Sequence, residues 1–128
     1  MLSMVGGMYD RLPVNAPPEA VVATLRDVLR ERGVTEYAVV DHGRDMAAAG
    51  QPAYPAWTLI FGNPAAGARL LGSDLAAAVD IPLRLAVIGR GEASEIVLRD
   101  MRTLIDADVA DDFTGVLRGL AEAARERS

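Results

Sequence analysis

Apolar residues recur along this chain in two spacings, one typical of strands and one typical of helices. Alternating or continuous apolar runs predict about five strands, at Met8–Val14, Tyr37–Val40, Trp57–Phe61, Ile81–Ile88 and Glu95–Arg99. The continuous apolarity of Tyr37–Val40 predicts a strand that is covered on both faces. Pro13 predicts a strand end or an edge position, because proline cannot donate a hydrogen bond to a neighbouring strand.

Apolar residues three and four positions apart predict a helix after the first strand and another at the end of the chain. The first helix enters at Asn15–Glu19, ends at Gly33, and turns one face inward at Val21, Val22, Leu25, Val28 and Leu29. The last helix has the clearest stripe, at Phe113, Val116, Leu117, Leu120, Ala121 and Ala124. Asp111 is its expected cap.

The sequence Gly62-Asn63-Pro64 separates the central strand from a helix of small residues. We expect Asn63 to cap this helix, Pro64 to occupy its first turn and Gly62 to permit a sharp bend. The helix is expected to direct Ala65, Ala68 and Leu71 toward the core. A second short turn, Leu75–Val79, follows with Ser73 or Asp74 as its cap.

Together these elements predict a two-layer α+β fold with a mostly antiparallel sheet of about five strands and helices on one face. A chain of 128 residues is the size of a single domain, so residues 1–128 are expected to share one core.

Composition excludes several kinds of chemistry. The chain has no cysteine, so it can form no disulfide, thiolate nucleophile or zinc–thiolate site. All 13 basic residues are arginine, which excludes Schiff-base chemistry and a P-loop lysine. The net charge of −5 and the pI near 4.8 argue against nucleic-acid binding.

Neither the first residues of the chain nor any apolar run predicts an association with a membrane. Residues Met1–Met8 are apolar but lack the charged start of a signal peptide, and no apolar run approaches the roughly 20 residues of a membrane-spanning helix. The expected location is therefore the cytoplasm.

Asp41, His42 and Asp45 form the most polar cluster of the chain. A carboxylate beside an imidazole can orient it for proton transfer, so the cluster is a candidate acid–base site. An exposed loop cluster and a ligand-contacting site are the alternatives, and both are favoured over catalysis. A metal would have to combine the single histidine with carboxylates such as Asp80, so neither a metal nor a cofactor is predicted.

The segments Asp41-His42, Phe61–Gly67, Leu70-Leu71 and Asp80–Arg84, with the alanine-rich run that ends at Gly50, resemble the domain of unknown function 302 family. The resemblance covers about residues 41–100, extends more loosely to Arg11-Leu12-Pro13 and the first helix, and leaves the last helix without a recognisable signature. Asp100-Met101 departs from the family's usual Asp-Pro pair. The resemblance implies a compact α+β fold similar to one half of the TATA-box-binding protein, often found as a homodimer. It implies no activity.

The leading functional hypothesis is a small ligand-binding or sensing domain that acts as a homodimer. Its pocket is expected to be lined by Asp41, His42, Asn63 and Asp80, which lie near strand and helix ends. A structural or protein-interaction module that uses a sheet face or the last helix is the alternative. An acid–base enzyme using Asp41, His42 and Asp45 ranks below both.

Overall fold

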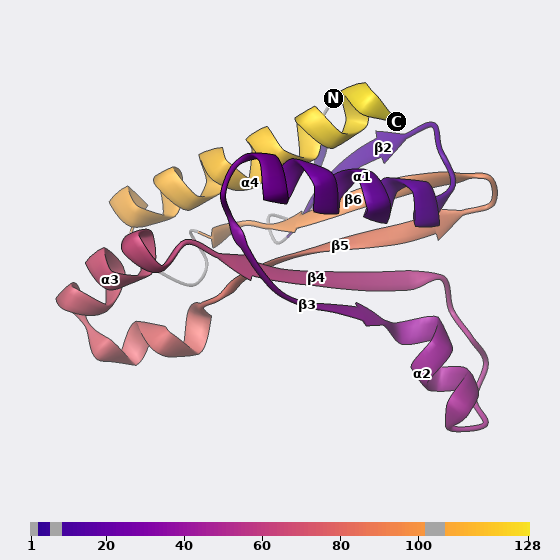
Figure 1. The fold of residues 1–128 in the computed structure, drawn as a ribbon, viewed down its shortest axis with the longest axis horizontal. Coiled ribbons are helices and arrows are strands. Elements are labelled where there is room, and N and C mark those ends of the chain that lie inside the picture. The colour runs from indigo at the N-terminus through magenta and orange to yellow at the C-terminus, as the bar shows by residue number, and fades with distance from the viewer. Residues whose placement is uncertain (1–2, 6–8, 102–106) are drawn as a thin grey trace.

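A computed structural model describes residues 3–5, 9–101 and 107–128. Its elements in chain order are β1 (Ser3–Val5), β2 (Tyr9–Val14), α1 (Pro18–Glu31), β3 (Thr35–Asp41), α2 (His42–Ala48), β4 (Ala56–Gly62), α3 (Pro64–Ser73), the 3₁₀ helix η1 (Leu75–Asp80), β5 (Leu83–Arg90), β6 (Ala93–Arg99) and α4 (Ala107–Arg127). Figure 1 shows α1 and α4 side by side on the sheet.

The strands form one antiparallel sheet in the order β1-β2-β6-β5-β4-β3. The α+β class and the antiparallel sheet with its five predicted strands are confirmed, and β1 is an additional short strand at the edge. Pro13 lies past the three residues of β2 that pair with β1, so it needs no hydrogen-bond partner on that side.

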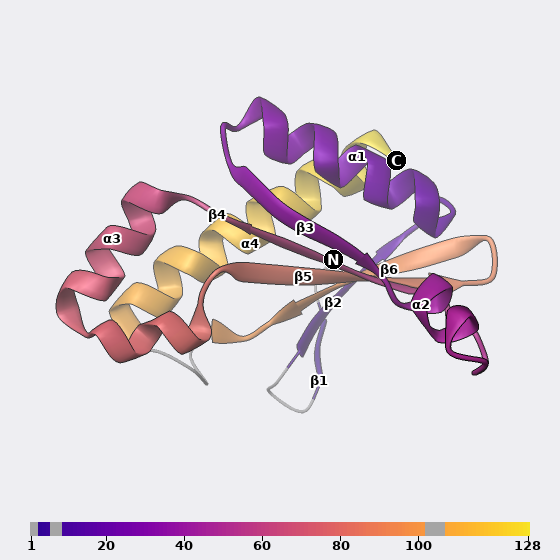
Figure 2. The same ribbon diagram turned by 60° about the horizontal axis from the view of Figure 1, so that its bottom comes forward.

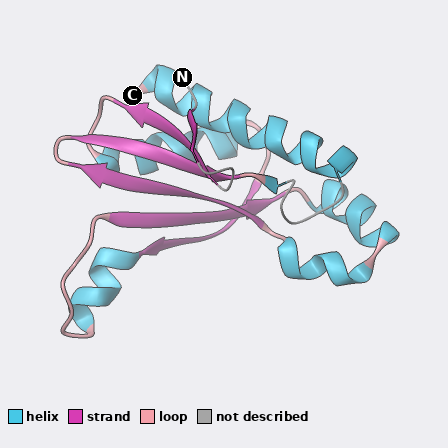
Figure 3. Ribbon diagram, turned by 180° about the vertical axis from the view of Figure 1, so that it is seen from behind, coloured by secondary structure: helices cyan, strands magenta, loops and turns pink. Residues whose placement is uncertain are grey.

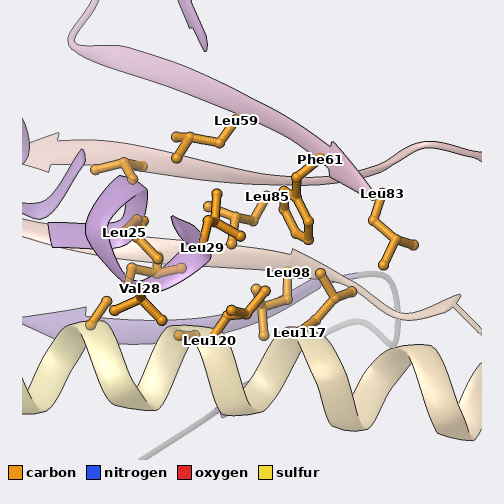
Figure 4. Packing of buried hydrophobic residues seen from close by; sticks show 14 of the residues in the cluster. Leu25, Val28, Leu29, Leu59, Phe61, Leu83, Leu85, Leu98, Leu117 and Leu120 are labelled. Carbon is orange, nitrogen blue, oxygen red and sulfur yellow. The ribbon is translucent and has the colours of Figure 1, made fainter. Parts of the chain in front are cut away.

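The core lies between the sheet and the pair α1 and α4. Every second residue of β2, β5 and β6 is buried on this face, as alternation in a strand requires. The predicted α1 face is confirmed, and the buried residues of α4 are Phe113, Leu117, Leu120, Ala121 and Ala124. Figure 4 shows Phe61 and Leu83 extending from the strands toward the α4 side of this core.

The two remaining helices lie at opposite ends of the sheet. Figure 2 shows α3 at one end and α2 at the other, while α1 and α4 share one side. The prediction of helices on one face therefore holds for α1 and α4, which cover the core.

The open face of the sheet carries the alternate strand residues. Across four neighbouring strands, Val40 is paired with Thr58, Thr58 with Ala86, and Ala86 with Val97. All four are only partly buried, whereas their neighbours on the core face are shielded by helices. The chain thus presents a row of small and apolar side chains on the face away from α1 and α4.

Two local predictions, on Tyr37–Val40 and on Asp111, are wrong. The segment Tyr37–Val40 belongs to the edge strand β3, and Tyr37 is 53% exposed, because no strand lies on its outer side. Asp111 lies inside α4, which begins at Ala107, so it is no cap.

The inward face of α3 also differs from the prediction. Leu70 is buried and Ala66 packs on the core, while Ala65 and Ala68 are exposed. Small residues give a weak periodic signal, because one alanine distinguishes the two faces of a helix poorly.

Candidate functional site

The first predicted site lies at the start of α2, beside the first residues of β4. The Asp41 carboxylate caps α2 by accepting a hydrogen bond from the backbone N–H of Arg44 at 2.9 Å. His42 Nε2 and Thr58 Oγ1 are hydrogen-bonded at 2.7 Å, and Asp45 Oδ1 lies 3.4 Å from Arg44 Nη2. The Thr58 hydroxyl, rather than either aspartate, is therefore the group that orients the imidazole.

Asn63 and Asp80 lie beyond the other end of β4. Asn63 Oδ1 accepts a hydrogen bond from the Ala65 N–H at 3.0 Å and caps α3, as predicted. Asp80 is the last residue of η1. Asp41 pairs with Trp57 at the start of β4, and the strand of seven residues separates the two ends by about 20 Å at roughly 3.3 Å per residue.

The four predicted site residues consequently do not share one pocket. Because β3 and β4 are antiparallel, the residues that follow these strands lie at opposite ends of the sheet. Figure 3 shows the separation, with α2 at one end and α3 with η1 at the other. Only Asn63 of the four lines the cavity described next.

A cavity of about 740 Å³ lies at the Asn63 end of the sheet, between α3, η1, the strand ends and α4. We refer to it as the α3–α4 cavity. Its apolar walls include Phe61, Leu71, Ile81, Leu83, Phe113 and Val116. A size between about 300 and 1,000 Å³ and a mainly apolar lining are typical of small-molecule sites.

A few polar side chains accompany these walls. Tyr37, Asn63, Arg32 and Arg69 also line the cavity, and the lining residues that the structure describes include no aspartate or glutamate. Apolar walls with a small number of polar groups can bind the body of a ligand and fix its orientation.

Local backbone geometry shapes the mouth of the cavity at Tyr37. The pairing of β3 with β4 is irregular between Glu36 and Ala38, so Tyr37 lies at a bulge. A Cβ atom on Gly62 would lie 3.3 Å from Tyr37 Cε2 and 3.7 Å from Pro82 Cβ. Glycine at position 62 thus leaves room for the tyrosine ring against the strand.

A second hollow of about 720 Å³ lies at the α2 end of the sheet. It is lined by prolines, glycines and the two glutamates Glu19 and Glu92, together with Asn15 and Ala16. Its described lining residues include no large aliphatic or aromatic side chain. The α3–α4 cavity is therefore the better candidate for binding an organic molecule.

Within the described ranges, no group of three or more histidine, cysteine, aspartate or glutamate residues could hold a metal ion. No helix in the described part of the chain is both long and apolar enough to cross a membrane.

Sequence reasoning missed most of the α3–α4 cavity. Most of its described lining residues lie within residues 61–83, but the residues that complete it, such as Arg32, Tyr37 and Phe113, come from distant segments and carry no local mark of a shared wall. One signal was available: Val116 belongs to the apolar stripe of α4, yet it is 46% exposed and lines the cavity. The apolar stripe of α4 is therefore wider than the buried core requires, and the extra residue lines the cavity.

One comparison with known proteins shows the family, and another supports the fold. The model of the domain of unknown function DUF302 matches residues 11–127, which includes the last helix, where the sequence analysis found no signature. The crystal structure of an uncharacterized conserved DUF302 protein from Bacillus stearothermophilus is similar, with a TM-score of 0.82 and 18% identity over 91% of this chain and 98% of that chain. No curated protein matches. The chain belongs to the DUF302 family.

Proposed function

We propose that this protein binds a small apolar molecule in the α3–α4 cavity. The observation that carries the proposal is a cavity of about 740 Å³ whose walls are mainly apolar side chains and whose polar groups are few. Two large side chains that line the cavity also support the proposal. Tyr37 has 53% and Val116 46% of its surface exposed to water, so an apolar ligand would gain free energy by covering them.

Binding of Nile red, an uncharged dye that fluoresces in apolar surroundings, tests this function. We expect saturable binding by the wild-type protein. Ala66→Trp places an indole where Ala66 lines the cavity and should weaken binding by about tenfold or more, because the ring occupies the ligand's space. Ala66→Leu fills the same wall more mildly and should give an intermediate loss.

Two matched variants complete the experiment. Ala65→Trp adds the same ring to the exposed neighbour on α3, and His42→Ala alters the opposite end of the sheet, so neither should change dye affinity. Circular dichroism checks that each variant is folded. Absence of dye binding, or equal losses in Ala65→Trp and Ala66→Trp, would contradict the proposed site.

A second candidate function is self-association through the open face of the sheet. It is supported by the row Val40, Thr58, Ala86 and Val97, which neither α1 nor α4 covers. Partly exposed apolar patches of this kind are typical of protein interaction sites. Light scattering on the purified protein measures its mass in solution, and a strictly monomeric protein at high concentration would refute this candidate.

A further inference from the structure

The charged residues that line the α3–α4 cavity, within the described part of the chain, are all of one sign. The chain as a whole has 18 acidic and 13 basic residues, but the charged lining residues that the structure describes are Arg32 and Arg69. In a protein with net charge −5, this lining concentrates positive charge at one apolar site.

Both arginines are free to bind an anion. Elsewhere on α1 and its surroundings, Arg26 is paired with Glu36 at 2.9 Å and Arg30 with Asp27 at 3.0 Å. Arg32 and Arg69, in contrast, form no ion pair with any carboxylate of the described residues. Their guanidinium groups therefore keep their hydrogen-bond donors available.

Arg32 reaches the cavity across the contact between α1 and α4. Its Nη1 atom lies only 3.1 Å from the position that a Cβ atom on Gly119 would occupy. The absent side chain of Gly119 leaves space for the guanidinium over α4, next to Leu120, which also lines the cavity. Arg69 approaches from α3.

We infer that the ligand is an apolar acid. This inference rests on the proposed function. The apolar body occupies the walls around Phe61, Leu83 and Phe113, and the anionic group pairs with Arg32, Arg69 or both. Guanidinium and carboxylate match in geometry and charge, so a carboxylate gains hydrogen bonds that an alcohol of the same length cannot equal.

Displacement of Nile red by molecules that differ only in their head group tests the inference. Decanoate, 1-decanol and decylamine are each titrated into the complex with the dye at neutral pH. Decanoate should bind about tenfold more tightly than decanol, because hydrogen bonds to a charged group are stronger than those between neutral groups. Decylamine should bind most weakly of the three, because its positive charge is repelled by the arginines.

Removal of the two arginine charges tests whether they cause the preference for decanoate over decanol. The Arg32→Gln and Arg69→Gln double variant should still bind Nile red but should bind decanoate and decanol equally. Arg84→Gln, which removes an exposed arginine from the open face of the sheet, is the matched control and should retain the preference.

The failures of the two proposals are distinguishable. If the dye binds but decanoate is no better than decanol, or if its advantage survives in the double variant, the acid inference is overturned and the apolar site stands. If Nile red does not bind at all, the proposed function itself is refuted.

Discussion

Gly89 lies where the loop at Pro55 and the start of α1 at Pro18 both approach β5 closely. It lies buried on β5, and its N–H donates a hydrogen bond to the Pro55 carbonyl at 2.8 Å. A Cβ atom there would lie 2.9 Å from Pro55 Cβ and 3.3 Å from Pro18 Cγ. Proline rings cannot rotate away, so the contact tolerates no larger residue without a backbone shift.

Gly89→Ala should therefore destabilise the protein by about 1–3 kcal/mol, the usual cost of overpacking. Gly115→Ala is the matched control, because Gly115 lies in α4 with nothing within 4 Å of its added Cβ, and it should be stabilising by about 0.5–1 kcal/mol. Urea denaturation measures both changes. A neutral effect of Gly89→Ala would show that the two prolines do not constrain this strand.

Two of the predicted caps and one turn are confirmed at this scale, because they depend on neighbours in the sequence, whereas the predicted cap Asp111 is wrong. Asn63 and Asp74 cap their helices through hydrogen bonds to residues two positions ahead. Gly33 has the positive φ of 66° that suits glycine after a helix. The role of Gly89 was not predictable, because Pro18 and Pro55 are distant from it in the sequence.

At the scale of elements, a pair of charges joins α1 to α4 outside their apolar contact. Two nitrogens of Arg127 donate to the two carboxylate oxygens of Glu31, at 2.6 and 2.8 Å. The hydrogen bond from Arg127 is the main cause that lowers the pKa of Glu31 below its ordinary value of 4.5. The carboxylate is thus charged in the folded protein at pH values where it would begin to protonate in the unfolded chain.

The stabilisation from this pair should be present above pH 4.5 and be lost as the pH falls through the lower pKa of the folded state. Arg127→Gln should therefore lower Tm slightly at pH 7, as expected of an exposed pair, and have no effect at strongly acidic pH. Arg125→Gln, in the same last turn of α4, is the control. A Tm difference between wild type and Arg127→Gln that is independent of pH would argue against the ion pair as its cause.

Elements with strong apolar periodicity were predicted well, and those with weak periodicity were not. The stripes of α1 and α4 contain large side chains, so their buried residues follow from spacing, with the exposed Val116 of α4 as the exception. In α3, alanine and glycine leave the inward face to be decided by packing. The continuous apolar run of β3 was assigned two covered faces, but position at the sheet edge is a property of strand order.

At the scale of the whole molecule, antiparallel pairing separates residues that the sequence places in similar settings. Asp41 ends a strand and Asn63 directly follows one, and each caps a helix, yet the two caps are at opposite ends of the sheet. The α3–α4 cavity arises in the reverse way, because the fold brings Arg32 and Val34, which follow α1, and residues of α4 against the stretch 61–83.

The open face of the sheet gives the last prediction, which concerns assembly. Ala86 lies near the middle of this face, paired with Thr58 on one side and Val97 on the other. If two copies pack through this face, Ala86→Glu buries a carboxylate without a partner and should convert dimers into monomers, because an unpaired charge in an interface is costly. Light scattering over a concentration series measures the change. Ala23→Glu adds the same charge to an exposed position of α1 and should leave the mass unchanged. A wild-type dimer that survives Ala86→Glu would direct the search for its interface to another surface, with the exposed Leu75 and Val79 of η1 as the next residues to change.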